Sequence, residues 1–220
     1  MSDPTFFIET PRLFLSYLQP AYPTHCDFLV ALYNTPEFIA SIGGHPTSIT
    51  TREAAQKVLA GRFRDEHARN GYGTYLVSLK PEGWEAMDKL DALSASTPVG
   101  TVGLMRGEEP DCYAAPDIGF AMLSEHMRKG YTKEAGLGLM EYLEKERGLK
   151  DVFGLCSLGN EVSKAVFRSL GFEDRGERAL RVFGGEVSSV WVKKGMSEDL
   201  VQDFTHNGIH FLVCNVVLLW

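Results

Sequence analysis

The chain has 220 residues, of which 44% are hydrophobic and 23% are charged, and its formal net charge is −7 at pH 7. This length and composition suit one globular domain with a single core, and they exclude a disordered or collagen-like chain. The acidic balance also argues against a nucleic-acid partner, because nucleic-acid binding calls for basic stripes on the surface.

The cysteines and the apolar segments bear on where the protein works. Cys26, Cys112, Cys156 and Cys214 are scattered, with no C-x-x-C pair. This spacing favours reduced thiols in a cytosolic or nuclear setting over a disulfide framework. The first residues lack the pattern of a signal peptide, and no apolar run approaches the roughly 18 residues of a membrane helix. We therefore expect a cytoplasmic protein, with a nuclear location also possible, and no membrane partner.

The first half of the chain alternates between strand-like and helix-like patterns. Apolar residues of period two predict a strand over Arg12–Tyr17. Thr50 and Glu53 form a capping-box pattern, which predicts a helix over Thr50–Asn70. The other predicted segments are a short helix, a strand, a connection with a helical turn near Trp84–Leu93, and a further strand: His25–Asn34, Gly73–Leu79, residues 80–97 and Pro98–Met105.

The stretch from Asp117 to Gly138 changes its period in the middle. Up to Met122 the apolar residues alternate with small or polar ones, which predicts a strand. A short basic turn follows, and from Thr132 the apolar residues fall at helical spacing as far as Gly148. The rest of the chain is organised around this strand–turn–helix.

The last third of the sequence predicts a strand, a helix and a hairpin: Val152–Cys156, Asn160–Leu170, and Phe172–Val182 paired with Glu186–Lys194. Val162, Val166 and Leu170 recur at helical spacing, so we expect them to be the buried face of that helix. Gly184 and Gly185 form the expected turn of the hairpin.

The order of these elements predicts the fold class. A strand, two helices and several strands precede a βαβα unit and the hairpin. This order predicts a single mixed α/β (α+β) domain, with a central, mostly antiparallel sheet flanked by helices, over residues 8–195. Residues 196–220 are expected to be a C-terminal extension of unknown role. Within it, His206 and His210 have metal-ligand spacing but no evident third ligand, so we expect no metal site.

The basic turn is a candidate anion site. A strand that leads directly into a helix leaves backbone N–H groups without partners at the helix N-terminus, and the helix dipole favours an anion there. Gly130 allows the backbone to approach a ligand, and Arg128, Lys129 and Lys133 add positive charge where phosphates would sit. The alternative is an ordinary strand–turn–helix with a solvated basic turn, and the usual phosphate motifs do not match.

Three motifs in order resemble the GNAT acetyltransferases. R-K-G-Y-T-K-E-A at residues 128–135 is similar to their G-K-G-Y-A-T-E-A signature. N-x-x-S from Asn160, followed by L-G-F at residues 170–172, resembles the branch that includes the ribosomal-protein N-terminal acetyltransferases. The opening E-T-P-R-L at residues 9–13 resembles the first strand of that branch. The chain departs from the pattern at Met127, Arg128 and Thr132, where the family usually carries other residues.

The resemblance implies an N-acetyltransferase with acetyl-CoA as donor, which transfers the acetyl group to a primary amine by direct attack on the thioester. The amine would belong to a peptide N-terminus or a small molecule. The competing interpretation is a non-catalytic acyl-CoA-binding or interaction module with the same fold. Oligomeric state stays open. The implied cofactor-binding residues are Met122, Leu123, Ser124, Arg128, Lys129, Gly130, Tyr131, Thr132, Lys133, Asn160, Ser163 and Phe167. Among them, a backbone N–H near Phe120–Met122 would polarise the thioester carbonyl.

Two residues are candidates for proton transfer. Asp117 lies where many relatives carry a carboxylate, which would accept the amine proton directly or through water. Its alternative role is only to begin the strand, and Glu9, Glu37 and His45 are rival bases. Many relatives carry a Tyr at the position of Phe167, and because phenylalanine has no hydroxyl, Ser163 one turn earlier would protonate the leaving thiolate. Its alternative role is a serine that bonds the backbone at a helix start.

Overall fold

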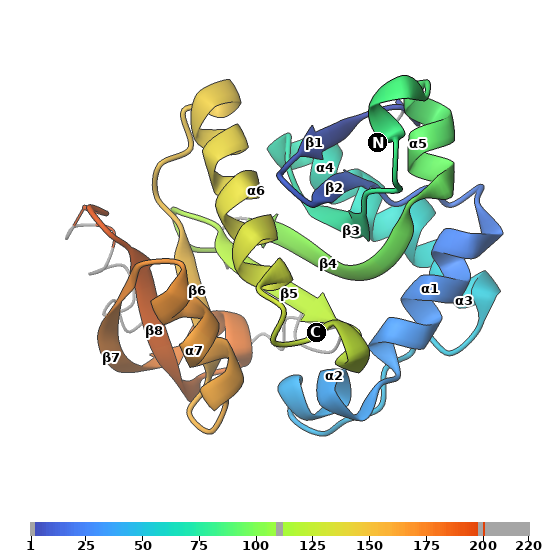
Figure 1. Cartoon of the computed structure of the whole chain (residues 1–220). Helices are drawn as coiled ribbons and strands as arrows, with labels where there is room; N and C mark the ends of the chain where they lie inside the picture. Colours follow the sequence, from blue (N-terminus) through green and yellow to red (C-terminus); the bar gives the residue numbers. More distant parts are fainter. Residues whose placement is uncertain (1–2, 109–111, 198–199, 201–220) are drawn as a thin grey trace.

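The computed structural model describes residues 3–108, 112–197 and 200. Eight strands form one sheet in the order β1-β2-β3-β4-β5-β6-β8-β7, and every neighbouring pair is antiparallel except β5 and β6 (Figure 1). The strands are Phe7–Glu9 (β1), Leu13–Tyr17 (β2), Thr74–Leu79 (β3), Thr97–Met105 (β4), Asp117–Met122 (β5), Phe153–Ser157 (β6), Phe172–Leu180 (β7) and Glu186–Lys193 (β8). The predicted fold class is confirmed.

Helices cover both faces of the sheet (Figure 1). They are Pro23–Tyr33 (α1), Pro36–Ser41 (α2), Arg52–Val58 (α3), Arg64–Asn70 (α4), Lys89–Ala95 (α5), Tyr131–Arg147 (α6) and Glu161–Ser169 (α7). A π-helical turn joins α3 to α4, and short 3-10 turns occur at Trp84–Ala86, Ser124–His126 and Arg181–Phe183. No helix among the described residues is long and apolar enough to cross a membrane.

The core has a separate layer on each side of the central strands. Ala135, Leu139 and Leu143 of α6 pack with Val102 and Ile118 of the sheet. On the opposite face, α1, α3 and the π-helical turn pack over β3, with the side chains Leu29, Leu32, Ala55, Leu59, Phe63 and Leu76 buried together. The two layers leave α6 and α7 on one face and the N-terminal helices on the other.

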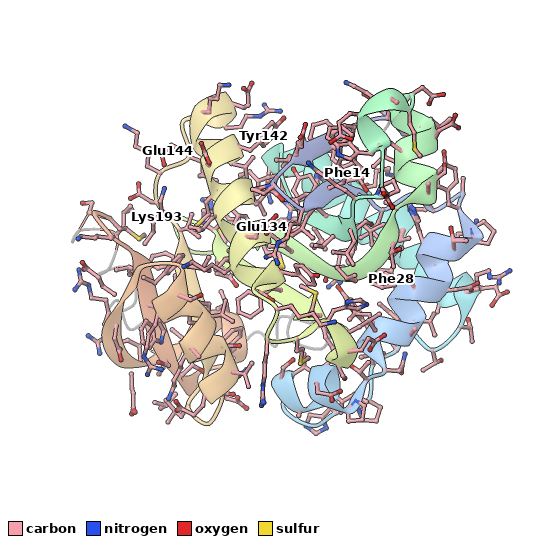
Figure 2. All side chains as sticks on the ribbon, in the orientation of Figure 1. Phe14, Phe28, Glu134, Tyr142, Glu144 and Lys193 are labelled. Carbon is pink, nitrogen blue, oxygen red and sulfur yellow. The ribbon has the colours of Figure 1, made fainter. Side chains whose placement is uncertain are left out.

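A third cluster fills the end of the sheet formed by β6, β8 and β7. Phe153, Leu155, Val190 and Val192 are buried there together with Met196, which follows the last strand. The Glu144 carboxylate of α6 and the Lys193 ammonium of β8 lie 2.7 Å apart and join the two parts of the domain (Figure 2). The predicted boundary between the domain and its extension stays a prediction, because residues 198–199 and 201–220, with His206, His210 and Cys214, lie outside the described residues.

Two expectations about helices are wrong in detail. The predicted helix over Thr50–Asn70 has its N-cap one residue later than predicted: Thr51, not Thr50, accepts a hydrogen bond from the Ala54 N–H, at 3.2 Å. The π-helical turn at Leu59–Phe63 then interrupts it. In α7, Val162 is 69% exposed rather than buried. Leu170, directly after α7, is buried as predicted, and Val166 is half-buried. The buried side chain that the pattern missed is Phe167, so the buried stripe is rotated from Val162 toward Phe167.

The position of the cap gives a prediction for stability. Thr51→Ala removes the side-chain acceptor at the start of α3 and should lower the free energy of unfolding by about 1 kcal/mol. Thr50→Ala is the matched control, because Thr50 is exposed and does not cap the helix. Urea denaturation of both variants measures the difference. An equal loss in the two variants would contradict the assignment of the cap.

Candidate active site

The sheet opens between its two parallel strands. Register pairs Asp117 of β5 with Phe153 of β6 and stops there, although β5 continues to Met122 and β6 to Ser157. Beyond this single pair the two strands diverge (Figure 1). Neighbouring strands normally satisfy each other's backbone groups along their whole length. The divergence therefore creates a wedge, with Asp117 at its apex, that is lined by backbone as well as side chains.

Two hydrogen bonds fix which backbone groups face the wedge. The Leu123 N–H donates to the Val99 carbonyl at 2.9 Å, so this residue points toward β4. The Phe153 N–H donates to the Pro116 carbonyl at 2.8 Å, so Pro116 points toward β6. Along a strand, the N–H and C=O groups of successive residues point alternately toward one neighbouring strand and the other. The N–H and C=O groups of Phe120 and Met122 consequently point away from β4 and into the wedge, whereas the Met122 side chain is buried in the core.

A cavity of about 160 Å³ lies in this wedge and brings several predicted residues together. Its walls come from five regions of the chain: Asp117, Gly119 and Phe120 of β5; Leu155 and Cys156 of β6; Asn160, Ser163 and Phe167 of α7 and its N-cap; Phe38, Ser41 and Ile42 of α2 and its C-cap; and Phe183, Glu186 and Ser188 at the turn into β8 and in that strand. Asp117 and Ser163, which were predicted from different motifs, thus line one cavity. A larger hollow of about 470 Å³ lies along α6, near Pro11 and Leu137, and shares none of these residues.

Asp117 is influenced by the like charge of a second carboxylate, Glu66, which the sequence pattern did not indicate as its neighbour. Burial raises the pKa of Asp117 to about 7, and the negative charge of Glu66 adds to the shift. Burial likewise raises the pKa of Glu66, in α4, to about 7, although Arg62 and Arg69 oppose the shift. Asp117 still keeps an accessible edge toward the cavity. The wedge therefore holds a carboxyl group that changes its charge near neutral pH.

The start of α7 has a different role in the cavity wall. The Asn160 side-chain oxygen accepts a hydrogen bond from the Ser163 N–H at 3.0 Å and so caps the helix. The amide N–H groups of Asn160 and one lone pair of its oxygen are left for a ligand. The ring of Phe167 is 1% exposed and lies over Gly154, where a Cβ would come within 2.8 Å of the ring. Phe167 therefore forms the floor of the cavity, and it has no polar group to offer.

The basic turn before α6 has the geometry of an anion site. Gly130 is the N-cap, with φ 82°, and no side chain caps the helix. The N–H groups of Tyr131, Thr132 and Lys133 belong to the first turn, where no carbonyl within the helix reaches them. Leu123 and Ser124 lie between the end of β5 and this turn. The turn thus offers backbone donors, the helix dipole and exposed cations on the same side of the sheet as α7.

Arg128 adopts the left-handed conformation with φ 60°, and it is the one non-glycine residue to do so in the described part of the chain. This conformation is uncommon for residues with a Cβ. The glycine of the family signature would suit this conformation, and Arg128 adopts it in spite of its Cβ. The Arg128 side chain is exposed and adds charge to the turn.

These features define a class of protein. A wedge between parallel strands, an open helix N-terminus beside a basic turn, and a titrating carboxyl in the cavity suit acyl transfer from a thioester carrier that bears a diphosphate. The comparisons agree: residues 12–173 match the acetyltransferase (GNAT) domain. The chain belongs to this family, whose members use acetyl-CoA, and the predicted family and cofactor are confirmed.

Solved structures show the same fold at low sequence identity. A ribosomal-protein-S5-alanine acetyltransferase from Vibrio fischeri has a TM-score of 0.62 and 18% identity, covering 86% of this chain and 96% of its own. A ribosomal L7/L12 alpha-N-protein acetyltransferase in complex with coenzyme A has a TM-score of 0.62 and 17% identity, and the match covers 86% of this chain and 97% of that one. An acetyltransferase from Agrobacterium tumefaciens has a TM-score of 0.61 and 19% identity, and the match covers 85% of this chain and 93% of that one. No curated protein matches the chain.

The strained turn gives a prediction that separates stability from binding. Arg128→Gly removes the strain of a left-handed residue, at the cost of a more flexible unfolded chain. The melting temperature should therefore stay the same or rise. The affinity for CoA should fall by roughly threefold to tenfold, because one charge near the diphosphate is lost. Calorimetry and thermal melting measure the two effects. A fall in melting temperature of several degrees would contradict the strain.

The carboxyl pair gives a prediction about pH. Because the pKa of Asp117 is raised from 3.8 to about 7 in the folded state, the folded protein binds more protons than the unfolded chain between these values. Asp117 therefore lowers stability as pH rises from about 4 to about 7. Asp117→Asn should be more stable than the wild type at pH 8, by at least about 1 kcal/mol, with a much smaller difference at pH 4.

Urea denaturation at the two pH values measures this effect. Glu66→Gln is the companion variant, because it removes the negative charge that faces Asp117. The pKa of Asp117, followed by NMR, should then move down toward its ordinary value. A stability difference between Asp117→Asn and the wild type that does not change with pH would contradict the raised pKa.

Proposed function

We propose that this protein is an acetyl-CoA-dependent N-acetyltransferase that transfers the acetyl group to a primary amine by direct attack on the thioester. The observation that carries the proposal is the wedge, where Asp117 and Ser163 line one cavity from different walls. A base for the amine and an acid for the leaving thiolate are the two proton-transfer roles that this reaction requires.

The donor site is formed by the turn and by the edge of β5. When bound, acetyl-CoA supplies an activated acetyl group as a thioester. Arg128, Lys129 and Lys133, with the first-turn N–H groups of α6, hold its diphosphate. The amide N–H groups of Asn160 bond the pantetheine arm. The N–H of Phe120 or Met122, which points into the wedge, polarises the thioester carbonyl. The remaining contacts come from Leu123, Ser124, Tyr131 and Thr132.

Asp117 is the proposed base. A carboxyl group with a pKa near 7 is partly ionised at neutral pH and has enough basicity to accept a proton from a bound ammonium, directly or through one water. Glu66 raises this pKa further through its charge and so tunes the base. The rival candidates Glu9, Glu37 and His45 do not line the cavity.

Ser163 is the proposed acid for the leaving group. Its backbone N–H is already used by the Asn160 cap, but its hydroxyl stays available on the cavity side of α7. A hydroxyl is a weak acid, so we expect its contribution to be modest. The Cys156 thiol also lines the cavity, but burial raises its pKa to about 11, which makes it a poor nucleophile.

The acceptor enters from the side of the N-terminal helices. Phe38 and Ile42 of α2 form an apolar wall, and Ser41 adds a polar group beside them. Such a wall suits the first residues of a peptide N-terminus or a small-molecule amine. Two of the similar structures are named as ribosomal-protein acetyltransferases, one of them as an alpha-N-protein acetyltransferase, which supports the peptide class. The proposed setting is the cytoplasm, where the buried Cys26 and Cys156 thiols stay reduced.

A thiol-release assay tests the proposal. The wild type, with acetyl-CoA and a mixed library of amines and N-terminal peptides, should release CoA and form an acetylated product that mass spectrometry identifies. Ser163→Ala should lower kcat by about tenfold to a hundredfold with little change in CoA affinity, as expected for a group that acts mainly in the transition state.

The same assay separates this function from the non-catalytic alternative. CoA binding without turnover on any amine would favour a binding module. A Ser163→Ala enzyme with wild-type kcat, when chemistry limits the rate, would remove Ser163 from the mechanism and leave the transfer itself intact.

A further inference from the structure

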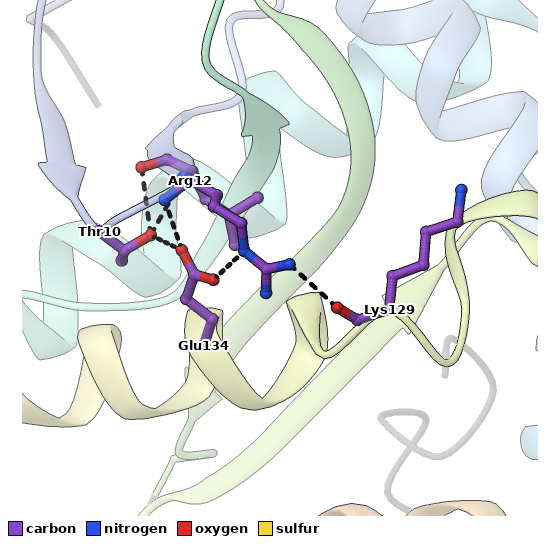
Figure 3. A network of polar contacts seen from close by, with 5 residues as sticks. Thr10, Arg12, Lys129 and Glu134 are labelled. Carbon is purple, nitrogen blue, oxygen red and sulfur yellow. Dashed lines mark hydrogen bonds and ion pairs between the residues drawn. The ribbon is translucent and has the colours of Figure 1, made fainter.

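The turn between β1 and β2 is hydrogen-bonded to the first part of α6 through the Glu134 carboxylate. Glu134 Oε1 accepts hydrogen bonds from Thr10 Oγ1 and from the Arg12 N–H, both at 2.7 Å, and Glu134 Oε2 accepts one from Arg12 Nε at 2.7 Å (Figure 3). The helix and this turn touch closely, since a Cβ at Gly138 would lie 2.5 Å from Thr10 Cγ2. Residues far apart in the sequence are thus held as one unit.

The far end of the Arg12 guanidinium reaches the basic turn itself. Arg12 Nη1 donates to the Lys129 carbonyl at 3.1 Å (Figure 3). The guanidinium also lies 4.5 Å from the centre of the Tyr131 ring. Arg12 Nη2 is 3.4 Å from the point where a Cβ on Gly130 would be. One side chain therefore contacts three consecutive residues at the N-terminus of α6.

This contact fixes the direction of a backbone donor. In a trans peptide the C=O and the following N–H point in opposite directions. Because Arg12 holds the Lys129 carbonyl, the Gly130 N–H of the same peptide points away from Arg12. The contact also keeps a carbonyl oxygen from turning toward a bound anion, which it would repel. The turn needs such support, because its residues Arg128 and Gly130 both have positive φ.

We propose that Arg12 is a positioning residue for the CoA diphosphate: held by Glu134 and Thr10, it locks the turn at Lys129–Tyr131 in the shape that presents backbone N–H groups to the phosphates. The inference rests on the proposed CoA site. It adds a function for a side chain near the start of the domain sequence, outside the motif at residues 128–135.

The electrostatics of Glu134 agree with this role. An acidic residue in the first turns of a helix suits the dipole but would repel a diphosphate bound at the same end. Although burial raises the pKa of Glu134, the hydrogen bonds from Thr10 and Arg12 hold it below its ordinary value. The carboxylate stays ionised and is directed at Arg12, so its charge is compensated before the ligand arrives.

The test compares Arg12→Ala with a matched control. Arg52 makes a similar two-pronged ion pair with Asp27, at 2.7 and 2.6 Å, on α1 and α3 away from the turn. Arg12→Ala should weaken CoA binding about tenfold by calorimetry, because the turn must then be ordered on binding. Arg52→Ala should leave CoA affinity unchanged within about twofold. Glu134→Gln keeps the shape of the side chain but removes the charge that holds Arg12, so it should also lower CoA affinity, by less than Arg12→Ala does.

A second readout separates positioning from general stability. Acetyl-pantetheine carries the thioester but no diphosphate, so the loss of kcat/KM in Arg12→Ala should be about tenfold smaller for this donor than for acetyl-CoA. Hydrogen exchange at the Glu134 amide, whose N–H donates to the Gly130 carbonyl at 3.0 Å, should also be faster in the unliganded variant.

Unchanged CoA affinity in Arg12→Ala, an equal loss in Arg52→Ala, or equal losses for both donors would overturn the proposal. Calorimetry with CoA needs no acceptor amine. This arm therefore gives its answer even if no amine is turned over, and the two failures can be told apart.

Discussion

The early end of the β5–β6 pairing is the constraint on which the rest of the structure depends. A single register pair, Asp117 with Phe153, joins the two halves of the sheet before the strands diverge. The backbone that would otherwise form a ladder is left to line a cavity. Helices α6 and α7 and the N-terminal helices can then reach this opening from opposite faces of the same sheet. A fully paired sheet would have no such opening.

Two family motifs, one at the start of the domain and one past its middle, are parts of one contact. Thr10 and Arg12 come from the opening motif, and Glu134 and the turn before it come from the central signature; 122 positions separate Arg12 from Glu134. Their spatial contact explains why both patterns occur in one chain. Gly138, within α6, belongs to the same contact, because its missing Cβ is what lets the helix approach Thr10.

Local sequence patterns predicted most helices and strands. They failed where a residue's burial or neighbours depend on long-range packing, or on a rotation of the helix by about one residue. Periodicity predicted the strand–turn–helix around Gly130, because each period is a local property. The partnership of Asp117 with Glu66 was missed, since Glu66 reads as an ordinary polar residue on a helix and its burial comes from distant packing. Val162 was misplaced because stripes one residue apart on a short helix look alike. The roles of the predicted cofactor-binding residues depend on their contacts with the ligand, and sequence patterns do not determine those contacts.

The left-handed Arg128 also bears on how such a turn evolves. Glycine would fit the backbone at this position at lower conformational cost, so selection for stability alone would favour it. Arg128 combines this conformational cost with a positive charge beside the helix N-terminus. Proteins tolerate such exchanges only while their total stability stays above a threshold. The buried layer between α6 and the sheet, directly beneath the turn, contributes to the stability on which such an exchange depends.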